Sequence, residues 1–254
     1  MPLILAPAPE HDALRGSVSI LDPHTAARQE IRPVRLLLID GDRTGGEALN
    51  GLLALLSDSP LQVEVGWESD GGPWDGLVAW SASASLPELP EVADVPAQLF
   101  IGGSAREALQ RHHRVVAEHL TRPLAGVIPH HVHATGSPLI ASQEDSVEIP
   151  VARDWRISAP SIAAVSGLEI LVADARAGVH LVHEPAARRL YVVNQLAITP
   201  LGLARRIRRL LPADDPQQDQ VPTLTWRTHA HLLVAAWLNA EVYQPASLGR
   251  WLVP

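Results

Sequence analysis

The chain has 254 residues, of which 46% are apolar, and a formal net charge of −8. All 20 of its basic residues are arginine, and it contains neither lysine nor cysteine. These two absences exclude a thiolate nucleophile, a disulfide framework, a cysteine-ligated metal site and a Schiff-base or phosphate-loop lysine. Any chemistry must therefore rest on Ser, Thr, His, Asp, Glu and Arg.

The charge and hydropathy of the chain also limit its partners. A net charge of −8 opposes binding to nucleic acid, because a protein that neutralises phosphates needs a basic face. No apolar run approaches the roughly 18–20 residues that cross a bilayer, and the start of the chain does not resemble a signal peptide. We therefore expect a cytoplasmic protein with neither nucleic acid nor a membrane as partner.

The first half of the chain alternates predicted strands and helices. Residues 1–30 are rich in Pro and Ala and contain one strand-like patch, at residues 17–21. Residues 34–40, VRLLLID, form the continuous apolar run that is typical of a strand buried on both faces. Further strands are predicted at residues 61–65, 76–80 and 98–101, and helices at residues 47–56 and 105–120.

The second half continues in the same way. Strands are predicted at residues 168–173, 180–183 and 190–193, and helices at residues 200–211 and 226–242. The helix at residues 200–211 has Thr199 as its expected N-cap and Pro200 at its first position. Residues 81–96 are rich in proline and residues 212–222 are acidic, and both predict loops.

Strands that alternate with helices predict an α/β fold with three layers, in which a mainly parallel sheet is flanked by helices. No internal repeat or linker divides the chain. We expect an N-terminal extension at residues 1–30, followed by a single domain at residues 31–254.

A series of short segments resembles the homoserine O-succinyltransferase family, whose members are acyltransferases of methionine biosynthesis. The matching segments are QEIRP (29–33), LLSDSPLQV (55–63), DGL (75–77), GV and HH (126–131), LEIL (168–171), WRTH (226–229), WLN (237–239) and VYQ (242–244). They occur in the family's order. The resemblance implies a class I glutamine-amidotransferase-like, flavodoxin-like fold, and acyl transfer from acyl-CoA to an amino acid.

The resemblance also locates the family's catalytic positions, and this chain has replaced them. The family's nucleophile is a cysteine at a strand-to-helix turn, where this chain has Gly102 followed by Gly103. The family's base is a histidine in a Gly-His-Pro-Glu stretch; here Gln195 replaces the histidine, and Ala197 replaces the glutamate that orients it. A lysine pair near the family's oxyanion site falls at Thr44 and Gly45.

Two arginines of the family's substrate site are kept. A serine that contacts substrate falls at Ala152, but Arg153 after it is retained, and the arginine that holds the amino-acid carboxylate is retained as Arg209. The resemblance therefore implies that Arg153 and Arg209 bind a small amino acid or acyl-CoA, with no further cofactor. By family analogy the protein is a homodimer.

These replacements oppose the family's mechanism. Gly102 has no side chain on which a covalent acyl intermediate could form, and Gln195 cannot exchange a proton near neutral pH. In a well-studied triad enzyme, loss of the nucleophile alone lowers turnover about a million-fold.

Other residues are candidates for a rebuilt site. Ser104 stands two positions after Gly102, and it is either a nucleophile with a histidine in reach or the N-cap of the following helix. His130 and His229 are candidate bases for direct transfer. The run HHVH at residues 130–133 either ligates a metal or consists of ordinary strand residues, and we expect no metal site.

Three further features have two interpretations each. The loop at residues 41–46 precedes a helix, where backbone amides favour anions, but it lacks the phosphate-loop lysine. The arginine-rich run at residues 205–209 is either a solvated face or turns Arg209 alone inward to a carboxylate. Trp80, at the family's active-site turn, is either an ordinary core residue or fills the old pocket.

Two hypotheses about function follow. In the first, the chain is a catalytically degenerate member of the homoserine acyltransferase family that acts as a binding or partner protein. In the second, it is an acyltransferase with a rebuilt site, which transfers an acyl group from CoA to a homoserine-like amino acid.

Overall fold

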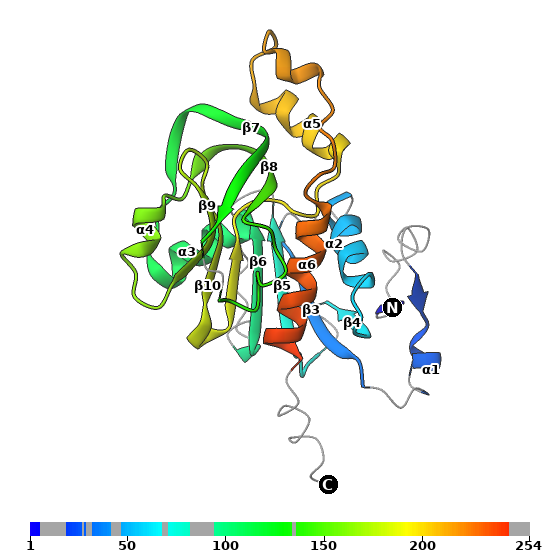
Figure 1. The fold of residues 1–254 in the computed structure, drawn as a ribbon. Coiled ribbons are helices and arrows are strands. Elements are labelled where there is room, and N and C mark those ends of the chain that lie inside the picture. The colour runs from blue at the N-terminus through cyan, green and yellow to red at the C-terminus, as the bar shows by residue number, and fades with distance from the viewer. Residues whose placement is uncertain are drawn as a thin grey trace.

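The computed structural model describes residues 1–5, 19–26, 28, 32–41, 47–67, 71–81, 94–133 and 136–243 (Figure 1). Its strands are β1 (Leu3–Leu5), β2 (Ile20–Leu21), β3 (Val34–Asp40), β4 (Val63–Gly66), β5 (Gly76–Ser81), β6 (Ala97–Gly102), β7 (Glu118–Val132), β8 (Ser146–Arg156), β9 (Glu169–Asp174), β10 (Gly178–Glu184) and β11 (Arg189–Val192). Its α-helices are α1 (Pro23–Ala26), α2 (Glu47–Ser57), α3 (Gly103–His113), α4 (Ala159–Ala163), α5 (Pro200–Leu210) and α6 (Arg227–Trp237). Shorter helical turns are η4 (Pro185–Ala187), η5 (Pro216–Asp219) and the π-helical η6 (Leu238–Val242).

All the described strands belong to one sheet, and the larger part of it is parallel. Its order is β2-β1-β4-β3-β5-β6-β11-β10-β9-β7-β8, and every neighbouring pair from β2 to β11 is parallel. In β3, Leu36 and Leu38 belong to one hydrophobic core, whereas Leu37 and Ile39 belong to another. The alternation explains why VRLLLID is apolar throughout, as the sequence predicts for a strand covered on both faces.

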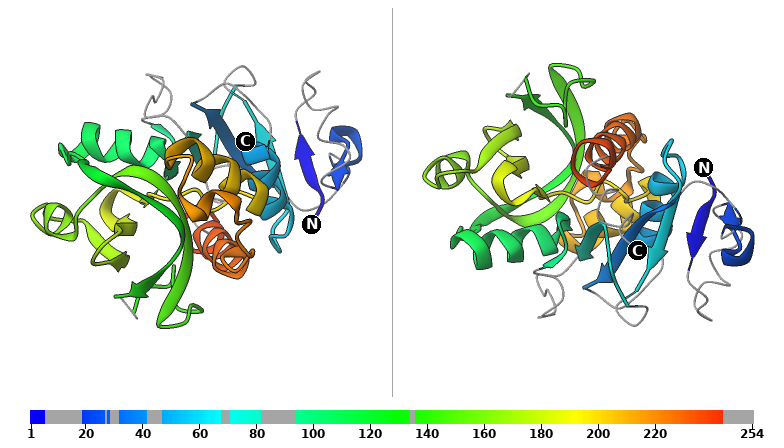
Figure 2. Two further views of the ribbon diagram at one scale, coloured as in Figure 1. Left: turned by 90° about the horizontal axis from the view of Figure 1, so that it is seen from above. Right: turned by 90° about the horizontal axis from the view of Figure 1, so that it is seen from below.

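The other end of the sheet is antiparallel. The pairs β11–β10, β10–β9, β9–β7 and β7–β8 are all antiparallel. β7 and β8 are the longest strands, and Figure 2 shows them curving past the end of the sheet, with α5 and α6 on one side and α3 on the other.

Helices cover both faces of the sheet, so the predicted three-layer α/β architecture is confirmed. Leu53 of α2 and Trp237 of α6 lie in the core on one face. Leu109 of α3 and Ile162 of α4 lie in the core on the opposite face. At about 25 cal/mol per Å² of buried apolar surface, the two cores supply the main driving force for folding.

The structure corrects one predicted helix. Residues 105–120 are not helical throughout, because α3 ends at His113 and Arg114 adopts a left-handed conformation with φ 59°. The N–H of Arg114 bonds back to carbonyls of the last turn, and the chain then enters β7. β8, the partner of β7, is not among the strands predicted from the sequence.

Other boundaries differ in detail. Residues 1–30, expected as an extension, contribute β1 and β2, and the three residues of β1 are buried. The predicted helix at residues 226–242 consists of α6 and the π-helical η6. Thr199 is confirmed as an N-cap, since its hydroxyl accepts a hydrogen bond from the Gly202 N–H at 3.0 Å. Among the described helices, none has both the length and the apolar character to span a membrane.

Candidate functional site

The strand-to-helix turn after β6 has an unusual backbone. Gly102 ends β6 with φ 68° and ψ −124°, and α3 begins at the next residue. Sharp turns of this kind, at the carboxyl end of a parallel strand, display the nucleophile in many α/β enzymes. This turn keeps that geometry, but it carries no side chain at Gly102.

The side chain of Gln195 lies where a side chain of residue 102 would begin. A Cβ built on Gly102 would come within 2.0 Å of Gln195 Nε2 and 2.6 Å of the Ser81 carbonyl oxygen. Gln195 Nε2 donates a hydrogen bond to that same carbonyl at 2.6 Å. The amide is therefore held between the turn and the end of β5, and it occupies the space that a side chain at residue 102 would enter.

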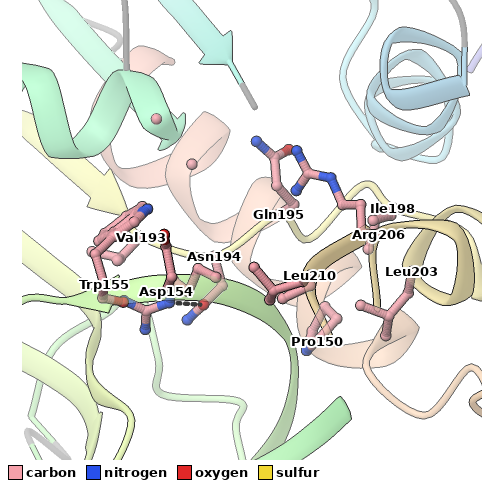
Figure 3. A pocket seen from close by; sticks show the side chains of 14 residues that line it. Pro150, Asp154, Trp155, Val193, Asn194, Gln195, Ile198, Leu203, Arg206 and Leu210 are labelled. Atoms are coloured by element: carbon pink, nitrogen blue, oxygen red, sulfur yellow. Dashed lines mark hydrogen bonds between the residues drawn. The ribbon is translucent and has the colours of Figure 1, made fainter. Parts of the chain in front are cut away.

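A cavity of about 160 Å³ opens beside this turn, between β8, α5 and the segment after β11 (Figure 3). Its polar side chains come from Arg153, Asp154, Asn194, Gln195 and Arg206. Its other lining residues are Gly102, Gly103, Pro150, Ala152, Trp155, Val193, Ile198, Leu203 and Leu210. A cavity of about 150 Å³ accommodates a molecule the size of benzene, so this one fits a small organic ligand.

Arg153 is the most deeply buried charge of the cavity, with 6% of its surface exposed. Its Nε donates to Asn194 Oδ1 at 3.1 Å, and its two terminal nitrogens donate to the Trp155 and Ala177 carbonyl oxygens, each at 3.0 Å. The guanidinium carbon also lies 4.8 Å from the centre of the Trp155 ring. Three hydrogen bonds and the contact with the Trp155 ring thus hold the Arg153 side chain in one orientation.

No carboxylate within the described residues neutralises Arg153. Its three hydrogen bonds all go to neutral acceptors, which leaves two of the five guanidinium N–H groups for another partner. Burial lowers the pKa of Arg153 to about 9, so that the group stays charged at neutral pH. A buried cation without a counter-ion is costly, and an anion in the cavity would relieve that cost.

Further charges lie at the edges of the cavity. Figure 3 shows Asp154 and Trp155 on one side of it and Arg206 and Gln195 on the other. The cavity therefore offers cationic groups and one carboxylate, which is the pattern that matches the two charges of an amino acid.

The structure brings together several residues that the sequence singled out. Gly102, Gly103, Ala152, Arg153 and Gln195 all line the cavity. Ala197 does not line it; its carbonyl oxygen lies against Gly51 of α2. Thr44 and most of the loop at residues 41–46 lie outside the described residues.

Arg209 is not turned inward as the resemblance implies. It is exposed on α5, and the cavity is instead lined by Leu203, Arg206 and Leu210. Leu203, Arg206 and Leu210 follow one another at spacings of three and four residues and so share one face of α5. Arg209 precedes Leu210 by one position, about 100° around the helix, and lies at the exposed edge of that face. Trp80 is 3% exposed and belongs to the hydrophobic core, so it does not fill the cavity.

The candidate catalytic residues do not reach the cavity. Ser104 lies inside the first turn of α3, buried, and its hydroxyl has no hydrogen-bond partner among the described atoms. It is not the N-cap either, because that position belongs to Gly102. His130 and His229 are buried on β7 and α6 and belong to a separate cluster.

That cluster contains three imidazoles. His180 of β10 lies between His130 and His229, with ring centres 5.8 Å and 5.2 Å away, and its Nε2 is 3.1 Å from His229 Nε2. Burial is the main cause that lowers the pKa of all three, to about 4 for His229. In the part of the chain that the structure describes, no group of three or more such side chains is arranged to hold a metal.

Sequence reasoning missed three residues of this region. Asn194 lines the cavity next to Gln195, Arg206 lines it from α5, and His180 is fully buried in β10. The helical spacing of Arg206 from Leu203 and Leu210 was a usable signal, as was a histidine within the apolar run at residues 179–182. Nothing in the sequence alone pairs Asn194 with Arg153.

The sequence of this chain is similar to those of known homoserine acyltransferases. The sequence model of the family described as homoserine O-succinyltransferase matches residues 88–248. A homoserine O-acetyltransferase of Synechococcus sp. is 30% identical over 282 residues, covering 91% of this chain and 94% of the relative. A homoserine O-succinyltransferase of Vibrio vulnificus is 27% identical and covers 93% of this chain and 91% of the relative.

Solved structures agree on the architecture. A glutamine amidotransferase of Thermotoga maritima superposes with a TM-score of 0.56 at 8% identity, over 84% of this chain and all of that one. A glutamine amido transferase from Methylobacillus flagellatus gives a TM-score of 0.52 at 12% identity, over 85% of this chain and 97% of that one. The fold is glutamine-amidotransferase-like, and the chain belongs to the homoserine O-succinyltransferase family of acyltransferases.

Proposed function

We propose that this chain is a catalytically degenerate member of its family that binds a small carboxylate, such as an amino acid, without transferring an acyl group through a thiol. The observation that carries the proposal is the pairing of a buried, uncompensated Arg153 with a turn whose nucleophile position is Gly102. On this proposal the chain keeps an arginine that can bind a carboxylate, but it has no nucleophilic side chain at the turn.

The size and lining of the cavity support a small ligand. A volume of about 160 Å³ admits an amino acid or a short acid, but not a whole acyl-CoA. Arg153 has two free N–H groups for a carboxylate, and Asp154 at the rim can accept an ammonium group. Apolar side chains of Pro150 and Leu203 would cover the aliphatic part of the ligand.

No observation favours the alternative of a rebuilt acyltransferase site. Ser104 is buried within α3 and does not line the cavity, and no described histidine is hydrogen-bonded to it. His130 and His229 are packed in the interior, with a pKa lowered by burial, and neither lines the cavity beside Gly102.

Binding measured by isothermal titration calorimetry tests the proposal. We expect L-homoserine or succinate to bind the wild-type protein at pH 7, and the neutral amide of the same acid to bind at least 30-fold more weakly. The difference arises because charge-assisted hydrogen bonds to arginine contribute about 2–3 kcal/mol. Equal affinity for acid and amide, or no binding of any acid of this size, would contradict a carboxylate site.

A further inference from the structure

A continuous chain of hydrogen bonds, buried except at its last residue, runs from the cavity through the interior. It starts at Arg153, whose Nε donates to Asn194 Oδ1 at 3.1 Å. Asn194 Nδ2 lies 3.1 Å from His180 Nδ1, and His180 Nε2 lies 3.1 Å from His229 Nε2. The chain ends at Gln143, whose Oε1 lies 3.0 Å from His229 Nδ1. We call these five side chains the Arg153–Gln143 relay.

The donors and acceptors of the relay have only one consistent direction. Gln143 Nε2 donates to the His229 carbonyl oxygen, so its Oε1 is left to accept from His229 Nδ1. His229 Nε2 is then the acceptor, and His180 Nε2 must carry a proton to donate to it. His180 Nδ1 in turn accepts from the Asn194 amide nitrogen.

The same direction is obtained from the other end. Arg153 can only donate, so the atom of Asn194 that faces it is the amide oxygen. The amide nitrogen of Asn194 then faces His180, as the interior end of the chain also requires. Starting from Gln143 or from Arg153 thus places the ring protons on the same nitrogens, His180 Nε2 and His229 Nδ1.

The relay has no position for an extra proton. A proton on His180 Nδ1 would face the Asn194 N–H, and one on His229 Nε2 would face the His180 N–H, so each would set two donors against each other. Burial is the main cause that lowers the pKa of His180, and electrostatic repulsion from His229, His130 and Arg153 lowers it further. Both imidazoles are neutral, and the relay is a fixed structural element.

We propose that the Arg153–Gln143 relay positions Arg153 for carboxylate binding, by fixing the Asn194 amide so that its oxygen faces the guanidinium. The inference rests on the proposed function, because it concerns the same cavity. His180, His229 and Gln143 are positioning residues that never touch the ligand, and each acts through its neighbour. The two guanidinium N–H groups left free by this arrangement are the ones available to the ligand.

Nuclear magnetic resonance of the imidazole nitrogens tests the relay without any ligand. We expect His180 to be protonated on Nε2 only and His229 on Nδ1 only, both at pH 7 and at pH 5.5. Each resonance is assigned from its loss in the corresponding histidine variant. A proton on His180 Nδ1, or a charged His180 or His229 at pH 7, would overturn the proposal.

A matched pair of variants tests the positioning role. In His229→Gln the amide oxygen can replace Nε2 and accept the hydrogen bond from His180. In His229→Asn the shorter side chain reaches only the position of Nδ1, so His180 loses its acceptor. We expect the Arg153 Nε–H, assigned from its loss in Arg153→Lys, to stay protected from solvent exchange in His229→Gln and to lose protection in His229→Asn. Equal protection of the Arg153 Nε–H from exchange in both folded variants would contradict the positioning role.

The carboxylate probes separate this inference from the proposed function. With L-homoserine or succinate, we expect His229→Asn to weaken affinity about 5-fold relative to His229→Gln, which corresponds to one net hydrogen bond. If the tautomers are as predicted but no carboxylate binds the wild-type protein, the proposed function fails and the relay remains as a structural feature. If carboxylates bind but the tautomers are reversed, the relay fails and the proposed function remains.

Discussion

Replacement of Gly102 by alanine is expected to lower the free energy of unfolding by about 2–5 kcal/mol. A residue with a side chain at φ 68° and ψ −124° stores about 1–3 kcal/mol of backbone strain. The new Cβ would also meet Gln195 Nε2 at 2.0 Å and the Ser81 carbonyl oxygen at 2.6 Å. Because the Ser81 oxygen is a backbone atom, it has little freedom to move. Urea denaturation of Gly102→Ala measures the loss.

A double-mutant cycle separates the two causes. In a Gln195→Ala background the amide no longer occupies the position, so Gly102→Ala should cost at least 0.5 kcal/mol less than in the wild type. Gly71 is a matched control, because it has φ 69° but nothing within 4 Å of its built Cβ, and Gly71→Ala should cost about 1–2 kcal/mol. A change below 0.5 kcal/mol for Gly102→Ala would show that the turn is not as tight as described.

This prediction bears directly on chemistry. A cysteine at residue 102 would begin with the same Cβ, so it would meet the same two groups. The thiol cannot simply be restored by one substitution, because Gln195 and Ser81 now close the position. The absence of a side chain at Gly102 and the placement of Gln195 are therefore sterically coupled.

Replacement of Arg153 by glutamine is expected to weaken carboxylate binding about 30- to 150-fold. The variant removes the only deeply buried charge of the described cavity lining and both N–H groups available to a ligand. Calorimetric titration with L-homoserine and succinate measures the change.

Two further variants make the result specific. Arg153→Lys keeps the charge but loses the planar fork, so its affinity should lie between those of the wild type and Arg153→Gln. Arg209→Gln, on the exposed side of α5, should leave the affinity unchanged. An effect of Arg209→Gln equal to that of Arg153→Gln would place the carboxylate at the exposed edge of α5 and contradict its binding in the cavity.

Much of the parallel half of the sheet could be predicted from the sequence, because its strands are short and apolar on both faces. VRLLLID matches β3 in its bounds, and residues 76–80 and 98–101 fall inside β5 and β6. The predicted strands at residues 168–173 and 180–183 overlap β9 and β10, whereas β7 and β8 at the antiparallel edge were harder to predict. β7 contains proline, glycine and exposed polar residues, and α3 ends at His113 with Arg114, rather than the usual glycine, in the left-handed position after it.

Only those site residues that can be recognised within a short segment of sequence could be predicted. Gly102 and Gln195 were found by their positions in the family's order, and the structure places them next to each other at the cavity. Which arginine of α5 faces inward depends on the rotation of that helix against β8, and this is set by packing of Leu203 and Ile207 rather than by the arginines. The relay joins residues from separate elements, and such long-range contacts leave no periodic signal in a sequence.

The release of free CoA tests the central claim most directly. Purified protein is incubated at pH 7 with acetyl-CoA or succinyl-CoA and L-homoserine, at concentrations where calorimetry gives saturation with the amino acid. We expect CoA release at the rate of the protein-free control, because Gly102 offers no nucleophile and Gln195 no base. Release that rises with L-homoserine, saturates, and is abolished by Ser104→Ala would contradict the account and establish a rebuilt acyltransferase site.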